Sequence, residues 1–319
     1  MLNFSLATKN ELAHLPKKKK CCARAELAAL LRMDGEIHIS GGDMFLQVVT
    51  DNAAVARRIF CLLKDVFRFS SGIMVVRRRR LRKNNVYFIR VDGRERVKEI
   101  METLGFIDSA GQIIGGVNPH LLSQDCCRRA YLRGAFLGGG SVSSPEGTYH
   151  LEITAGSEEH AAQLVEVMKG YGLTPGINRR RNKVVVYLKG SDGISTLLSL
   201  MGAHTALLNF ENVRIYKDMR NHINRLVNCE TANLNKTVDA AVRQVENIRF
   251  LDRHLGIDNL PPGLKEVARL RLAYPDASLK ELGNLLNPPL SKSGVNHRLR
   301  RLDLLAEKMR AEGEGKKDG

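Results

Sequence analysis

The segment CCARAELAALLRMDGEI, residues 21–37, decides the fold, because a second segment of the same length, CCRRAYLRGAFLGGGSV, occupies residues 126–142. Six positions are identical at a constant offset of 105 residues, whereas chance would supply about one. The identical pairs are Cys21 with Cys126, Cys22 with Cys127, Arg24 with Arg129, Ala25 with Ala130, Leu27 with Leu132 and Gly35 with Gly140. The chain therefore contains a duplicated unit.

Charge is the second informative property of the chain. Its 319 residues carry a net charge of +16, and its isoelectric point is about 9.8. Such an excess of Lys and Arg favours a polyanionic partner, either nucleic acid or an anionic membrane surface. No apolar stretch approaches the roughly 20 residues that span a bilayer, and the N-terminus lacks a signal-peptide hydrophobic region. We therefore expect a cytoplasmic protein. The helix-turn-helix pattern described below makes double-stranded DNA the expected partner, with a nucleoid-associated location, no membrane and no small-molecule substrate.

Four of the six cysteines form two vicinal pairs at the start of the repeated segments, Cys21-Cys22 and Cys126-Cys127. No CxxC motif or Cys/His ligand spacing occurs in the sequence. Adjacent cysteines suit neither a disulfide framework nor a zinc site, so we expect small residues on a packed helix, with redox sensing as the alternative. The sequence predicts no metal site and no cofactor.

Apolar periodicity predicts the same order of elements in both copies. The first copy is predicted to contain a helix over 22–34, strands over 36–41 and 44–50, a helix over 53–66, strands over 72–79 and 85–92, and a helix over 95–104. The second is predicted to contain a helix over 124–137, strands over 141–144 and 149–155, a helix over 158–171, strands over 174–179 and 184–189, and a helix over 194–201. Two such units paired through their first helices would form a saddle with pseudo-two-fold symmetry.

The predicted fold is thus an α+β N-terminal domain, a duplicated αββαββα saddle, followed by an all-α helix-turn-helix domain. Residues 203–232 give a weak signal of mixed helix and loop. The expected division is a basic N-terminal arm over 1–20, repeat 1 over 21–106, repeat 2 with the following segment over 107–225, a linker helix over 226–260, the helix-turn-helix domain over 261–310 and a disordered tail over 311–319.

The C-terminal region carries the pattern of a DNA-binding helix-turn-helix. Ser278-Leu279-Lys280-Glu281 is a capping box, Asn287-Pro288-Pro289-Leu290 predicts a turn, and Ser291 is placed to cap the next helix. From Ser291 to Arg301 that helix carries four Lys or Arg residues and no acid. Arg suits guanine, Asn suits adenine, and Lys and Ser suit phosphates; a solvated helix of a small bundle is the alternative. The predicted DNA contacts are Ser278, Ser291, Lys292, Ser293, Asn296, His297, Arg298, Arg300 and Arg301.

Both copies also place basic residues between their last two strands. These tips would meet phosphates if the saddle straddles a duplex; otherwise they are solvated turns, or the saddle holds a protein. The predicted phosphate contacts are Arg77, Arg78, Arg79, Arg80, Arg82, Lys83, Arg179, Arg180, Arg181 and Lys183.

Two family resemblances rest on these residues. LAALLRMDG, residues 27–35, resembles the LAGLIDADG helix of homing endonucleases. The whole chain, including RLVNCETANLNKT (225–237) and LSKSGVNHRLRRLDLLA (290–306), is similar to the WhiA family of bacterial regulators, which join a LAGLIDADG-like domain to a C-terminal helix-turn-helix. The resemblance implies a sequence-specific DNA-binding regulator involved in cell division, chromosome segregation or sporulation gene transcription.

The same resemblance predicts that the chain is not an enzyme. A LAGLIDADG nuclease needs an acid at the eighth motif position of both copies, because two carboxylates hold the divalent ions. The first copy supplies Asp34, but the second, LRGAFLGGG (132–140), supplies Gly139. Neither Glu36 nor Glu152 occupies the motif position, so we expect Asp34 to be vestigial. The alternatives are a residual metal-dependent endonuclease, or a scaffold that binds a transcription or cell-division protein through the saddle.

Overall fold

The computed structural model divides the chain into two units, residues 1–218 and 219–319, which we call the α+β unit and the helical unit. The structure describes residues 3–16, 19–41, 43–68, 71–77, 85–108, 110–180 and 183–314. Among them, no helix combines the length and apolar character that crossing a bilayer requires.

The first repeat forms one antiparallel sheet with its covering helices. Its elements are α2 (Lys20–Asp34), β1 (Gly35–Ser40), β2 (Asp43–Thr50), α3 (Ala53–Phe67), β3 (Gly72–Arg77), β4 (Asn85–Asp92) and α4 (Arg94–Thr103). The strand order is β1-β2-β4-β3. Asn52 begins α3 by accepting hydrogen bonds from the backbone N–H groups of Ala54 and Val55, and Leu46 and Val48 alternate inward along β2.

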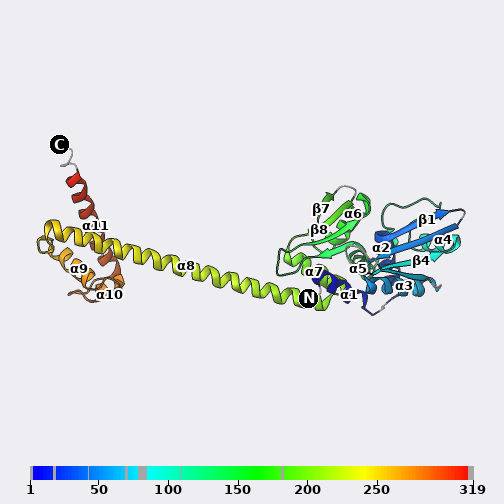
Figure 1. Ribbon diagram of the computed structural model, residues 1–319, viewed down its shortest axis with the longest axis horizontal. Coiled ribbons are helices and arrows are strands. Elements are labelled where there is room, and N and C mark those ends of the chain that lie inside the picture. Colours follow the sequence, from blue (N-terminus) through cyan, green and yellow to red (C-terminus); the bar gives the residue numbers. More distant parts are fainter. Residues whose placement is uncertain are drawn as a thin grey trace. The chain divides into compact units, whose positions relative to one another are not determined.

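The second repeat has the same order and topology. After a short helix η1 (Pro119–Leu122), it contains α5 (Asp125–Gly139), β5 (Gly140–Val142), β6 (Leu151–Ala155), α6 (Glu158–Lys169), β7 (Gly176–Arg180), β8 (Lys183–Leu188) and α7 (Ser191–Met201). Its strands lie in the order β5-β6-β8-β7. Figure 1 shows α2 and α5 side by side, with one sheet on each side of the pair. The predicted duplicated α+β fold is confirmed.

Small residues let α2 and α5 approach closely. A Cβ atom at Gly134 of α5 would overlap the backbone carbonyl oxygen of Glu26 in α2 and lie 2.8 Å from the Cβ of Ala29. Leu27 and Leu132, which correspond in the two copies, are both fully buried. Backbone contact of this kind leaves no room for a larger side chain at position 134.

A buried ion cluster lies on the same helix pair. The carboxylate of Glu26 is 1% exposed. Arg58 of α3 donates to it from Nε at 2.7 Å and from Nη2 at 3.0 Å. Arg133 of α5 donates to it from Nη2 at 2.6 Å and from Nε at 3.0 Å. Because Glu26 and Arg133 come from different repeats, the cluster joins the two copies through charge-assisted hydrogen bonds.

The basic arm expected over residues 1–20 is wrong for its central part, which forms helix α1 (Phe4–Ala13). Asn3 caps the helix by accepting a hydrogen bond from the backbone N–H of Ser5. Thr8 and Leu12, four residues apart, are fully buried. Thr8 donates its hydroxyl to the carbonyl of Phe4, which makes its burial tolerable. The run of lysines that suggested an arm begins only at Lys17.

The mixed helix and loop expected over 203–232 is also wrong, because residues 204–255 form one helix of 52 residues, α8 (His204–Leu255). Neither Gly nor Pro occurs within it, so nothing in the segment breaks a helix. The flanking Gly202 and Gly256 have φ angles of 92° and 79°, which stop a helix. The predicted linker helix over 226–260 is therefore part of α8 and of the short helix η2 (Ile257–Asn259).

The rest of the helical unit consists of α9 (Pro262–Ala273), α10 (Leu279–Asn284) and α11 (Lys292–Glu314). Its core joins all of these helices to the end of α8. The core residues are Ile248, Leu251, Leu260, Leu264, Val267, Ala268, Leu282, Leu286, Val295, Leu299, Leu302 and Ala306. Since α11 continues to Glu314, the disordered tail expected over 311–319 is wrong for residues 311–314; residues 315–319 lie outside the described part of the chain.

The ion cluster makes a clear prediction about stability. We expect Glu26→Ala to lower the free energy of unfolding of the α+β unit by about 3–5 kcal/mol, because it leaves the buried guanidinium of Arg58 and the half-buried one of Arg133 without an anion. Urea unfolding of the full chain measures the effect. The matched control is Glu102→Ala, which removes an exposed ion pair with Lys98 and should cost less than about 1 kcal/mol. Equal losses in the two variants would contradict the assignment.

Candidate nucleic-acid interface and nuclease remnant

Two caps and one tight turn hold the helix-turn-helix together. In the capping box, Ser278 N–H donates to Glu281 Oε2 at 2.7 Å and Glu281 N–H donates to Ser278 Oγ at 3.3 Å. Ser291 caps α11 by accepting a hydrogen bond from Gly294 N–H at 3.2 Å. A Cβ atom at Gly283 of α10 would overlap the carbonyl oxygen of Leu290, so the turn packs directly on α10. These contacts fix where α11 begins relative to α10.

The two sides of α11 differ sharply. Val295, Leu299 and Leu302 are at most 1% exposed and face the core. The outer side carries the exposed predicted residues Ser291, Lys292, Ser293, His297, Arg300 and Arg301, while Asn296 is half-buried. Ser291, Lys292, Ser293 and Asn296 line one shallow hollow of about 490 Å³ beside Leu279 of α10. The structure thus brings most of the predicted DNA contacts onto one face.

Ser291 and Ser293 share a hydrogen bond of 2.9 Å between their hydroxyl oxygens, and two further predicted DNA contacts have partners elsewhere in the fold. Arg298 is half-buried, and its Nη1 donates to the backbone carbonyl of Gly263 at 3.1 Å, which ties α11 to α9. The hydroxyl of Ser278 is engaged in the capping box. Both residues therefore position the motif, and the outer face keeps Lys292, Arg300 and Arg301 as its cations.

The basic tips of the saddle are described only in part. Arg78, Arg79, Arg80, Arg82, Lys83 and Arg181 lie outside the described residues. Arg77 is exposed at the end of β3. Arg179 pairs with Glu158 at 2.9 Å, and Arg180 lies 3.5 Å from Glu152. Lys183 is exposed opposite Arg180 in the hairpin. Exposed ion pairs of this kind contribute about 0–1 kcal/mol, so the arginines can exchange their carboxylates for phosphates.

Asp34, the acid of the first motif copy, lies at the C-terminal end of the α2–α5 pair. A Cβ atom at Gly138 would be 3.1 Å from Asp34 Oδ2, so the carboxylate faces the end of α5. Lys9 of α1 reaches the same place, where its ammonium donates to the carbonyl of Gly138 at 3.4 Å. Burial raises the pKa of Asp34 to about 6, against the charge of Lys9, which lowers it. Burial likewise lowers the pKa of Lys9, partly offset by the charge of Asp34. The acid therefore has a cationic side chain as its neighbour.

The opposite position has no room for a second acid. A Cβ atom at Gly139 would lie 2.5 Å from the Cε of Met33 and 2.7 Å from the backbone oxygen of Thr154. Glu152, the other carboxylate considered above, has its own partners: His150 at 3.2 Å and Arg180 at 3.5 Å.

Lys9 was absent from the sequence prediction because it lies in the segment expected to be an arm. The spacing of Phe4, Thr8 and Leu12 was the signal that could have placed it on a helix.

The vicinal cysteines are brought together in a way that their spacing did not predict. Cys21 and Cys22 lie in the first turn of α2, and Cys126 and Cys127 lie in the first turn of α5. All four sulfur atoms lie within 4.8 Å of one another. Burial raises the pKa of Cys22 to about 11 and that of Cys127 to about 12. The interpretation as small packing residues does not explain why four thiols converge.

Asp34 predicts a pH dependence of stability. Its folded-state pKa of about 6 lies above the ordinary value of 3.8 for an aspartate, so the folded protein binds a proton more tightly than the unfolded chain. The stabilisation that the protonated Asp34 side chain contributes is therefore fully present below pH 4 and is lost as the pH rises through 6. We expect Asp34→Asn to remove that loss and to raise the free energy of unfolding at pH 7 by about 1–2 kcal/mol.

The measurement is urea unfolding of the wild-type and variant chains at several pH values between 4 and 7. Burial lowers the pKa of His160 to about 4, so the stability that this group contributes is lost as the pH falls. Both chains contain His160, so comparing them cancels its contribution. Glu99→Gln, at an exposed position of α4, is the control and should leave the pH profile unchanged. A variant less stable than the wild type at pH 7 would show that Asp34 is stabilised as the anion.

Comparison with known proteins accounts for nearly the whole chain. Residues 20–107 match the WhiA N-terminal LAGLIDADG-like domain, residues 128–220 the WhiA LAGLIDADG-like domain, and residues 223–306 the WhiA C-terminal HTH domain. Two relatives bear the name "Probable cell division protein WhiA". The one from Desulforamulus reducens is 58% identical over 314 residues, 97% of each chain. The one from Heliobacterium modesticaldum is 56% identical over 313 residues, 98% of each chain.

A solved structure agrees with these matches. The crystal structure of full-length DUF199/WhiA from Thermatoga maritima is 26% identical in sequence and superposes with a TM-score of 0.60, covering 96% of this chain and 98% of that one. The likeness and the three matched domains together span both units of this chain. The chain belongs to the WhiA family.

Proposed function

We propose that this protein is a non-enzymatic, sequence-specific DNA-binding regulator of cell division, in which α11 reads the base sequence. The observation that carries the proposal is the exposed basic face of α11 on a helix whose other face is fully buried. The names of the two relatives support the link to cell division. Control of transcription, with effects on chromosome segregation or sporulation, is the mode of action that a helix-turn-helix suits best.

The chemistry of that face fits the major groove. Arg300 and Arg301 carry guanidinium groups, which pair in bidentate fashion with O6 and N7 of guanine. Asn296 carries an amide that can pair with adenine in the same way. Lys292 and Ser293, beside the hollow under α10, suit phosphate oxygens, which set the register of the helix on the duplex.

The α+β unit would add affinity without choosing a sequence. Arg77, Arg179, Arg180 and Lys183 are exposed cations at the ends of strands, and phosphate contacts of this kind are independent of base identity. A protein partner on the saddle is the alternative: it would leave DNA binding to the helical unit alone.

The surroundings of Asp34 and Gly139 support binding without cleavage. Lys9 lies beside Asp34 where a LAGLIDADG nuclease would need a divalent ion, and the backbone around Gly139 excludes a second carboxylate. One carboxylate with an ammonium neighbour does not form a two-metal site.

Nicking of supercoiled plasmid tests the non-enzymatic assignment directly. We expect the full chain with Mg²⁺ or Mn²⁺ to nick plasmid no faster than the Asp34→Asn variant does, because neither chain has the pair of carboxylates that activates water. The measurement is the fraction of open circular DNA over time on agarose. Nicking by the wild-type chain that the Asp34→Asn variant loses would overturn the non-enzymatic assignment.

DNA-binding measurements test the exposed basic face of α11. The probe is the duplex that the wild-type chain enriches from a random-sequence library. We expect Arg300→Ala combined with Arg301→Ala to weaken binding to this probe on the order of a hundredfold, since each bidentate base contact contributes about 1–3 kcal/mol. Binding to a scrambled duplex should fall much less.

The control for this experiment lies on the same helix. Lys308 is exposed and is paired with Glu312 at 3.9 Å, and Lys308→Ala removes one charge without touching the predicted face. Its affinity for the probe should stay within about threefold of the wild type. If the control and the double variant lost affinity equally for both duplexes, α11 would contribute charge alone.

A further inference from the structure

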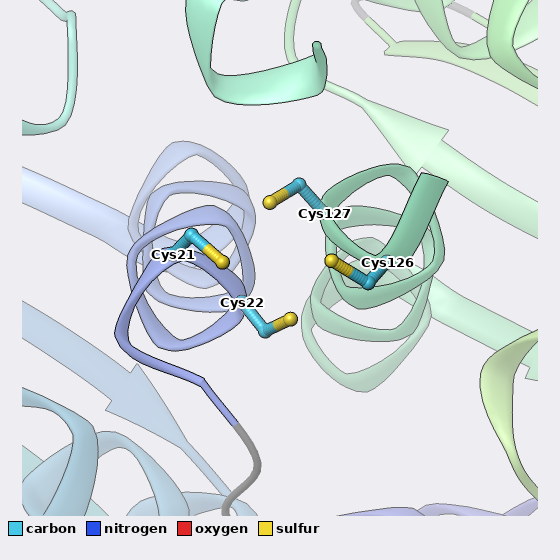
Figure 2. A group of neighbouring side chains, drawn as sticks. All are labelled: Cys21, Cys22, Cys126 and Cys127. Carbon is cyan, nitrogen blue, oxygen red and sulfur yellow. The ribbon is translucent and has the colours of Figure 1, made fainter. Parts of the chain in front are cut away.

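The N-terminal ends of α2 and α5 bring together four thiols that the proposed function does not use. Each helix contributes two adjacent cysteines from its first turn. Figure 2 shows all four sulfur atoms in the space between the two helices, on side chains that point toward one another. The four sulfur atoms lie within 4.8 Å of one another. Cys22 and Cys127 are buried, and Cys21 and Cys126 are partly exposed.

We propose that Cys21, Cys22, Cys126 and Cys127 form a tetrathiolate site for a single thiophilic divalent cation, zinc above all. Zinc bound by four cysteines is tetrahedral with Zn–S distances of about 2.3 Å, which sets the sulfur atoms about 3.8 Å apart. Sulfur atoms that already lie within 4.8 Å of one another reach that geometry by small rotations of the side chains. The pairwise CC spacing escapes the usual zinc motifs because the pseudo-two-fold symmetry, and not a single loop, assembles the ligands.

The surroundings suit an anionic metal centre. A zinc ion with four thiolates carries two negative charges, and the partial positive charges of two helix N-termini lie next to it. Lys19 and Arg129 line the same cavity of about 470 Å³ as Cys22 and Cys126, together with Asp125, which pairs with Arg129 at 2.9 Å.

Gln124 forms hydrogen bonds with two of the four thiols. Its Oε1 accepts hydrogen bonds from the thiols of Cys21 at 3.6 Å and Cys126 at 3.5 Å. When the thiols are deprotonated, rotation of this amide would present its NH₂ group to the sulfur atoms. Side chains in this position orient metal ligands and tune their basicity.

The site would reinforce the pairing of the two repeats. Its ligands come equally from α2 and α5, so a bound ion would crosslink the helices at their N-terminal ends. Binding to the folded chain alone stabilises it in proportion to ligand concentration. The inference does not depend on DNA binding, because none of the four cysteines belongs to the proposed DNA-binding face.

Metal analysis of the full chain is the primary test. The protein is purified under reducing conditions without a metal-affinity tag, and its zinc content is measured by inductively coupled plasma mass spectrometry. We expect one zinc ion per chain. Cobalt added to the metal-free chain should give the intense visible bands of a tetrahedral tetrathiolate, and zinc should displace it. Removing zinc with a chelator should lower the melting temperature of the α+β unit.

Variants separate this site from the other thiols. We expect Cys22→Ser and Cys126→Ser to weaken zinc binding at least tenfold and to lose the tetrathiolate cobalt spectrum. The controls are Cys61→Ser in α3 and Cys229→Ser in α8, which should bind zinc and cobalt like the wild type. Circular dichroism checks that each variant is folded, and chelation of the wild-type chain keeps the test valid if Cys22→Ser does not fold.

Three results would overturn the proposal. A folded, reduced wild-type chain that binds neither zinc nor cobalt would exclude the metal site. A cross-helix disulfide that forms even with zinc present, seen as the loss of two hydrogen masses, would make the cluster a redox pair. Iron and sulfide in equal amounts with broad visible absorption would replace a single ion by an iron–sulfur cluster.

Discussion

The close pairing of α2 with α5 is the contact on which the α+β unit depends. Gly134 allows backbone contact with Glu26, and the carboxylate of Glu26 binds arginines from both repeats. Each helix leads directly into the first strand of its own sheet, so the pairing also sets where the two sheets lie. A buried carboxylate with two guanidinium partners is costly to desolvate but specific in geometry, which suits a contact that must form in one register.

The two ends of this helix pair carry different chemical groups. At the C-terminal end, an acid faces glycine and a lysine from α1. At the N-terminal end, four thiols converge. The four thiols come from corresponding positions of the two copies, so the duplication explains why they are paired. Asp34 and Gly139 also correspond, but they differ in chemistry, and Lys9 lies outside both repeats.

Local patterns predicted the order of helices and strands in both repeats, because amphipathic periodicity is a property of short segments. The outer face of α11 followed from the same reasoning. Helix α1 was missed because its buried face includes the polar Thr8. The first half of α8 was missed although Ile215, Met219, Ile223 and Leu226 recur at spacings of three and four; these residues are exposed. Lys9 beside Asp34 and the four converging sulfur atoms arise from the pairing of distant segments, which no local spacing rule reports.

In the proposed function, α11 reads the base sequence and the α+β unit is a binding platform. Genome-wide DNA occupancy tests this division most directly, measured by crosslinking and immunoprecipitation in cells whose only copy is the wild type or the Arg300→Ala, Arg301→Ala variant. At equal protein levels, we expect the variant to lose the site-specific peaks and to keep at most a diffuse background. The same peaks at the same heights in both strains would contradict it.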